Sequence, residues 1–228
     1  MKIVNSMKTL LLVYGLNFFS WNEKTIKNQN MENINRTSIV KAVEQNQLKE
    51  VEKALKNGAD VNTQNRGKQT LLLIATRNEN FEMAKLLVSY GADVNLQDEI
   101  SDSPFLYAGA SGQAAFVKLF FENGARYDVF NRYNGSALIP ACERGHVETV
   151  KLLANTKGFP IDHVNRLGWT ALMEAVILGN GSKKYQEVVQ ILLDAGCNIN
   201  NPDKNGVTAL QHAEAMGFKE IVAILKSK

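Results

Sequence analysis

The sequence has few of the residues that usually hold metals or perform catalysis. Its 228 residues include three histidines and two cysteines. It contains no Cys-x-x-Cys pair, no His-Glu-x-x-His, no phosphate-binding glycine loop and no Gly-x-Ser-x-Gly motif. Because each of these chemistries needs its residues at a fixed spacing, we expect no enzymatic activity, no metal ion and no cofactor.

A long hydrophobic run and a strong charge of one sign are also lacking. The net charge of +3 gives no support for binding to nucleic acid. The apolar run over residues 9–19 is too short to cross a bilayer as a helix. With 45% hydrophobic and 21% charged residues, the composition is typical of ordered soluble proteins.

Residues 1–35 differ from the rest of the chain. Lys2 and Lys8 precede the apolar run, a pattern typical of a secretory signal, and Met7 could be the true first residue. Phe18, however, lies where signal cleavage needs a small residue. Two interpretations follow: an exported or periplasmic protein, or a cytoplasmic one with a loose N-terminal helix or a misassigned start. Residues 21–35 are rich in asparagine and lysine, which predicts a flexible linker.

A unit of two short amphipathic runs recurs along the rest of the chain. One copy runs from Thr70 through two apolar segments to Gly91-Ala92-Asp93-Val94-Asn95. The threonine or serine that opens each copy is found at Thr37, Thr70, Ser103, Ser136, Thr170 and Thr208, at spacings of 33, 33, 33, 34 and 38 residues. A period in this range predicts stacked structural repeats.

The residues that carry the period resemble those of the ankyrin repeat, in the form found in bacterial ankyrin-repeat proteins. The closing signature recurs at residues 58–62, 91–95, 124–128 and 196–200. The resemblance implies an all-α solenoid of about six helix-turn-helix repeats with short hairpin loops, which binds other proteins on its concave face. The repeats are expected near residues 36–65, 66–98, 99–131, 132–165, 166–203 and 204–228.

Helix stability must come from stacking in such a chain. Each predicted helix has about eight to ten residues, and isolated helices need roughly 12 to 15 to be stable. Leu72 and Ala75 fall on one face of a first helix, and Leu87 and Val88 on one face of a second. Each repeat therefore has an apolar surface that only its neighbours can cover. Polar outer faces in the first and last repeats are typical of caps.

Several local features predict departures from the regular repeat. Pro140 falls in a first helical turn, where we expect a distortion. Asn134-Gly135 and Asn205-Gly206 suit primed hairpin turns. An insertion over residues 179–185 is either neutral surface drift or a loop that contacts a partner. The two cysteines occupy different repeat positions, so we expect no disulfide.

In ankyrin proteins the hairpin tips and the exposed side of the first helix bind partners. Carried over to this sequence, the partner-binding residues are Arg66, Gln69, Glu99, Ile100, Asp102, Arg132, Tyr133, Arg166, Leu167, Trp169, Ile177, Lys204 and Asn205. One tip column holds four basic residues and Glu99. It predicts either attraction of an acidic partner surface or charges that are merely solvated.

Trp169 is the sharpest candidate within that set, since a hairpin tip needs no tryptophan. With Tyr133, Arg166, Leu167 and Ile177 it forms either the energetic centre of an interface or packing between adjacent hairpins. We therefore expect a monomeric, non-enzymatic scaffold that binds a protein partner. The alternative is an inhibitor or protector of a specific bacterial enzyme.

Overall fold

The computed structural model describes residues 35–227, so the expected leader and nearly all of the expected linker lie outside the described residues. These residues form two compact units that divide between Ala59 and Asp60. Regular structure in the described range is helical, apart from two isolated β-bridges. None of the described helices is long and apolar enough to cross a membrane.

The first unit is one helical hairpin. A helix over residues 35–44 is followed by α2 (Leu48–Lys56). Ile39 and Val43 of the first helix are buried, as are Val51 and Leu55 of α2. The buried positions follow helical spacing, which the sequence pattern predicted.

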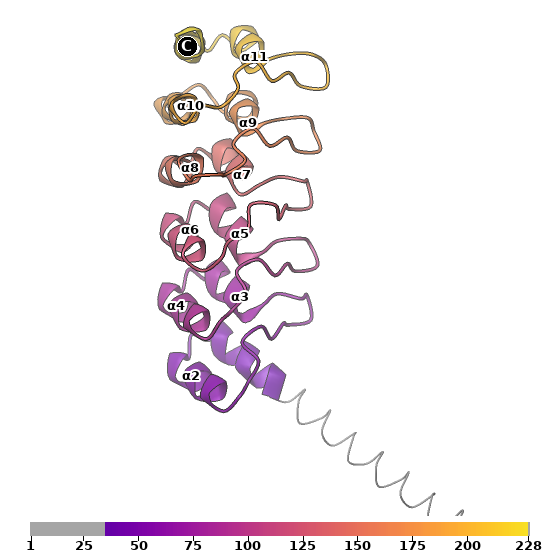
Figure 1. Cartoon of the computed structure of the whole chain (residues 1–228), viewed down its shortest axis with the longest axis vertical. Helices are drawn as coiled ribbons and strands as arrows, with labels where there is room; N and C mark the ends of the chain where they lie inside the picture. The colour runs from indigo at the N-terminus through magenta and orange to yellow at the C-terminus, as the bar shows by residue number, and fades with distance from the viewer. Residues whose placement is uncertain (1–34, 228) are drawn as a thin grey trace, which may run out of the picture. The chain divides into compact units, whose positions relative to one another are not determined.

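The second unit is a stack of five helix pairs. In order these are α3 (Leu71–Arg77) with α4 (Phe81–Ser89), α5 (Pro104–Ala110) with α6 (Ala114–Phe121), α7 (Leu138–Arg144) with α8 (Val147–Ala154), α9 (Ala171–Ile177) with α10 (Lys183–Asp194), and α11 (Ala209–Ala215) with α12 (Lys219–Lys226). First helices pack on first helices, and second helices on second helices, from one pair to the next (Figure 1). The expected all-α repeat architecture is confirmed.

Apolar burial between the pairs stabilises these short helices. Leu72 and Ala75 of α3 and Leu87 of α4 are fully buried. Each buried leucine side chain contributes about 1.5–3 kcal/mol. The helix α4 ends at Ser89, and Gly91 two residues later has a left-handed φ of 84°, a conformation that glycine adopts without steric penalty.

The distortion expected at Pro140 is present at the start of α7. In four other first helices the opening Thr or Ser accepts a hydrogen bond from the backbone N–H three residues later, at Leu73, Leu106, Met173 and Gln211. Ser136 makes no such bond, and its buried hydroxyl has no partner. Pro140 has no N–H to donate to the carbonyl of Ser136. The helix α7 therefore begins one residue late, after Ala137.

The insertion before α10 has a structural role that neither sequence interpretation foresaw. It lengthens α10 to 12 residues, beginning at Lys183. Tyr185 is buried, and its hydroxyl donates to the carbonyl of Glu143, 2.8 Å away. Lys184 Nζ donates to the carbonyl of Arg144 at 3.0 Å. The added turn thus joins α10 to the C-terminal end of α7 by hydrogen bonds.

Candidate protein-binding surface

Five hairpin loops project from the second unit, one before each first helix (Figure 1). We call them fingers A to E, comprising residues 60–70, 93–103, 126–136, 160–170 and 198–208. Each finger carries its turn at the tip. The tip residues predicted to bind a partner all lie on these fingers.

A side-chain oxygen shapes the tip of every finger. It belongs to Asn65, Asp98, Asn131, Asn165 or Asp203, and it accepts two tip N–H groups at 2.8–3.1 Å. Each tip has one left-handed residue, at Lys68, Ser101, Asn134, Gly168 or Gly206. The predicted primed turns are wrong, because a primed turn needs a left-handed central residue, and the central pairs Arg132-Tyr133 and Lys204-Asn205 have none. The Asn or Asp side chain satisfies the tip amides instead.

Asn and Asp side chains also join neighbouring fingers at their bases. Asn62 accepts the backbone N–H of Asp93 at 2.8 Å, and Asn95 accepts that of Arg126 at 2.8 Å. Within one loop, Asp93 accepts the N–H of Asn95 at 2.8 Å. The recurring Asp-x-Asn pairs therefore stabilise the loops. The described residues contain no group of three or more His, Cys, Asp or Glu side chains that could hold a metal ion.

Three large apolar side chains lie exposed at equivalent tip positions of consecutive fingers. Ile100 of finger B is 47% exposed, Tyr133 of finger C 56% and Leu167 of finger D 53%. We call these three residues the apolar tip row. Finger A has Gly67 and finger E has Asn205 at the same position. The row is therefore confined to the three middle fingers.

The charged tip column lies one residue before the apolar row. Arg66, Glu99, Arg132, Arg166 and Lys204 are all exposed. The Arg132 guanidinium lies 4.8 Å from the centre of the Tyr133 ring. Lys204 Nζ donates to the carbonyl of Arg166 and so links fingers D and E. The column is accessible, with basic residues in four of five fingers.

Asp102 and Gln69 are engaged within the protein. Asp102 pairs with Arg77 of α3 at 3.1 Å and lies 3.9 Å from Arg132. Burial and the neighbouring Asp98 raise the pKa of Asp102 above its ordinary value. Gln69 accepts a hydrogen bond from Asn65 Nδ2 at 2.8 Å. These two predicted site residues therefore shape fingers A and B.

Apolar side chains flank the first helices of the last two repeats: Trp169 lies before α9, Ile177 and Leu178 lie at its C-terminal end, and Met216 follows α11. Trp169 and Ile177 are half-buried. Leu178, next to Ile177, is 48% exposed, and Met216 at the end of α11 is 43% exposed. Sequence analysis missed Leu178 and Met216. Both lie eight residues after the opening threonine of their repeat, and that register could have identified them.

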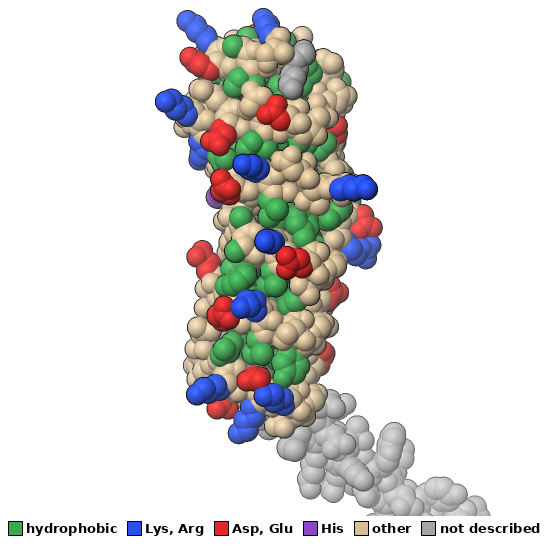
Figure 2. All heavy atoms as spheres, turned by 60° about the vertical axis from the view of Figure 1, so that its left-hand side comes forward, with side chains coloured by type: hydrophobic (Ala, Val, Ile, Leu, Met, Phe, Trp, Pro, Cys, Tyr) green, Lys and Arg blue, Asp and Glu red, His purple; other side chains and the backbone are tan. Residues whose placement is uncertain are grey.

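The face formed by the second helices differs from the fingers in how its charges are distributed. Figure 2 shows Lys, Arg, Asp and Glu side chains interspersed with hydrophobic ones on this face of the second unit. Lys85 pairs with Glu82 of the same helix at 3.3 Å. Charges of both signs alternate here, so this face has no column of one sign like that on the fingers.

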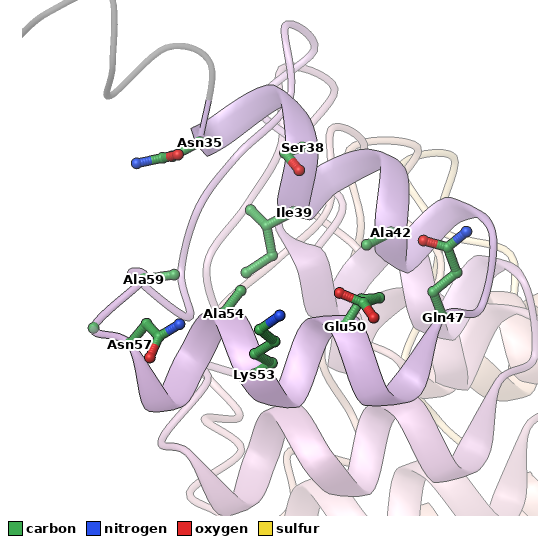
Figure 3. Close-up of a pocket in the computed structure, with 11 residues that line it drawn as sticks. Asn35, Ser38, Ile39, Ala42, Gln47, Glu50, Lys53, Ala54, Asn57 and Ala59 are labelled. Carbon is green, nitrogen blue, oxygen red and sulfur yellow. The ribbon is translucent and has the colours of Figure 1, made fainter.

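A hollow of about 500 Å³ lies in the first unit, between the helix over residues 35–44 and α2 (Figure 3). Ile39, Ala42 and Ala54 line it together with the polar Glu50 and Lys53. In the repeat alignment, Glu50 and Ala54 replace the Met83 and Leu87 of the next repeat. This polarity is typical of an end cap, and it offers no catalytic cluster.

Comparison with known proteins identifies the repeats. The model of the family described as ankyrin repeats (three copies) matches residues 5–98, 39–131 and 105–203. The putative ankyrin repeat protein YahD of Escherichia coli (strain K12) is 44% identical over 86 residues, which are 37% of this chain and 42% of that protein. The chain thus matches less than half the length of YahD.

Solved structures share the fold over most of the chain. An ankyrin repeat domain from Acinetobacter baumannii AYE is 44% identical, with a TM-score of 0.81, over 83% of this chain and 96% of that domain. The ankyrin repeat protein EF0377 is 39% identical, with a TM-score of 0.80, over 82% and 96%. The ankyrin repeat domain of Bcl-3, a member of the IkappaB family, is 26% identical, with a TM-score of 0.74, over 83% and 84%.

Proposed function

This chain belongs to the ankyrin repeat family, whose repeats generally mediate protein–protein interaction, and we propose that it is a non-enzymatic scaffold that holds a protein partner against its fingers. The observation that carries this proposal is the apolar tip row. A water-exposed series of large apolar side chains costs solubility and is typical of interaction sites.

The fold itself does not require the apolar tip row. The backbone of each tip is held by the Asn or Asp oxygen, whichever residue follows it. Gly67 and Asn205 occupy the same tip position in fingers A and E, where the same hydrogen bonds form. The side chains of Ile100, Tyr133 and Leu167 are therefore free to serve a partner.

The neighbouring residues extend this surface toward the last two repeats. Leu178 and Met216 add exposed apolar area. The indole N–H of Trp169 makes no hydrogen bond within the described chain, so it can donate to a partner. Aromatic residues combined with arginine commonly dominate the binding energy of an interface. Trp169 and Arg166 supply this combination in finger D.

The basic column gives the partner a preferred charge. Four basic residues and one acidic residue flank the apolar row, so a partner with an acidic surface would be attracted and oriented. The attraction acts mainly on the rate of association and weakens as salt increases. We propose an acidic surface on the partner for this reason.

A pull-down with the purified full chain tests the proposal. The double variant Tyr133→Asp/Leu167→Asp places two charges in the apolar row. Tyr90→Asp is the matched control, because Tyr90 is also an exposed aromatic residue but lies at the end of α4, outside the finger tips. Proteins from an extract of the source cells should be retained by the wild type and the control and lost by the double variant. Equal retention by all three would contradict the proposal.

A further inference from the structure

Finger D is anchored by a buried acid that other repeats do not have. Glu174 of α9 is 4% exposed. Three other repeats place Ile74, Tyr107 and Pro140 at the equivalent position, four residues after the opening Thr or Ser. Acidic residues are almost never buried unless they are paired. The burial of the Glu174 carboxyl group therefore needs a hydrogen-bonding partner to explain it.

One chain of hydrogen bonds links Glu174 to the tip of finger D. Asn165, itself 7% exposed, donates from Nδ2 to Glu174 Oε1 at 2.7 Å. The other side-chain atom, Asn165 Oδ1, accepts the backbone N–H of Leu167 at 2.9 Å and of Trp169 at 3.1 Å. Glu174 therefore orients the amide that shapes the tip.

We propose that Glu174 is a positioning residue for the finger surface: through Asn165 it holds finger D in the shape that presents Leu167 and Trp169. The effect of Glu174 on partner binding rests on the proposed function, whereas its effect on the conformation of finger D does not.

The surroundings of Glu174 disfavour its charged form. Burial, and then the nearby Glu143 of α7, raise its pKa to about 7, while the hydrogen bond from Asn165 lowers it. Cys142 of α7 is a buried thiol whose pKa is raised well above its usual range, so it adds no charge. The helices α10 and α11 also pack against α9, and their titratable side chains have other partners. On α10, Tyr185 bonds to the Glu143 carbonyl and Lys184 to the Arg144 carbonyl. On α11, His212 bonds to Asp203 and Glu214 pairs with Lys226.

The bond between Asn165 and Glu174 needs an acceptor oxygen and not a charge. A neutral carboxyl and a carboxylate both have an oxygen that can accept from Asn165 Nδ2. The positioning of finger D therefore depends on the acceptor at residue 174.

Finger B provides an internal control. The equivalent residue in that finger is Asp98, and its second oxygen lies 3.5 Å from Arg77 Nη2. Asp98 Oδ1 accepts the N–H groups of Ile100 and Asp102, as Asn165 does for finger D. Because Asp98 holds this tip without Glu174, substitutions of Glu174 should leave finger B unaltered.

Amide hydrogen exchange in the purified full chain tests the proposal. Glu174→Gln keeps an oxygen that accepts from Asn165, whereas Glu174→Leu fills a similar volume without an acceptor. Rates for the Leu167 and Trp169 amides would be measured in the wild type and in both variants. Exchange of these two amides should be at least tenfold faster in Glu174→Leu than in Glu174→Gln, and the rates for the Ile100 and Asp102 amides should agree in all three proteins.

Two results would overturn the proposal. Equal rates for the Leu167 and Trp169 amides in Glu174→Leu and Glu174→Gln would show that the bond from Asn165 to residue 174 does not hold the tip. An equal rise in fingers B and D would show that the substitution weakens the whole stack rather than loosening one finger. Because exchange is read in the free protein, failure here leaves the proposed function standing, and failure of the pull-down leaves the role of Glu174 standing.

Discussion

The backbone N–H of Arg166 donates a hydrogen bond to the carbonyl of Tyr133, 2.9 Å away, and so joins fingers C and D at their tips. A similar bond, from Glu99 to Gly67 at 3.2 Å, joins fingers A and B. The Arg166–Tyr133 bond fixes the spacing of two members of the apolar tip row. Because this part of the surface is already ordered, a partner has less conformational entropy to remove on binding.

Substitution of Trp169 distinguishes a role in partner binding from a role in internal packing. We predict that Trp169→Ala weakens partner binding about 30-fold, the size expected for a central interface residue, and changes the melting temperature by less than about 2 °C. The ring is half-buried and makes no hydrogen bond within the described chain. Binding would be measured by titration and stability by thermal unfolding. A lower melting temperature with unchanged binding would assign Trp169 to packing.

Reversing two basic tip residues tests the charge of the partner. The double variant Arg132→Glu/Arg166→Glu should slow association and reduce its dependence on salt. Association rates at about 50 and 300 mM salt would be compared with those of Lys85→Glu, a reversal on the face of the second helices. If all three proteins associate at the same rate, the basic column consists of solvated charges only.

Stability should depend on pH through Glu174. Its pKa is about 7 in the folded chain and 4.5 in its ordinary state, so the native contribution is fully present below pH 4.5 and is lost as pH rises to 7. The free energy of unfolding of Glu174→Gln relative to the wild type should therefore increase over this range, by at most about 3 kcal/mol. Urea unfolding at pH 5 and pH 8 measures this difference. An identical difference at both pH values would contradict the assigned pKa.

Gly109 tests how closely the repeats approach each other. A Cβ atom added to it would lie 2.6 Å from the Cβ of Ala137. We predict that Gly109→Ala destabilises the chain by about 1–3 kcal/mol through overpacking. The control Gly67→Ala, where the nearest atom would be 3.6 Å away, should cost less than about 0.5 kcal/mol. Equal effects in urea unfolding would show that the α5 contact adapts without strain.

The repeat period and the apolar spacing predicted the helices of this chain. They do so because each repeat reuses the same buried positions, such as Leu72 and Leu87. The effect of Pro140 was also predictable, because a missing N–H has the same consequence in any first turn. These features depend on local sequence, which is available without coordinates.

The tips and their anchors were less predictable. Asn134-Gly135 indicated a primed turn centred on these two residues, but the turn runs from Asn131 to Asn134, and the side chain of Asn131 satisfies its tip amides. The Asn165–Glu174 bond joins residues nine positions apart, and nothing in a single repeat distinguishes this acid from a surface one. Leu178, in contrast, could have been identified from its place eight residues after Thr170.

Site-specific photocrosslinking tests the central claim most directly. A photoreactive amino acid would replace Leu167 in one full-chain protein and Tyr90 in another, and each would be irradiated in an extract of the source cells. The account predicts a discrete crosslinked protein at position 167 and none at position 90. A partner captured only at position 90 would contradict the claim that the fingers form the binding surface.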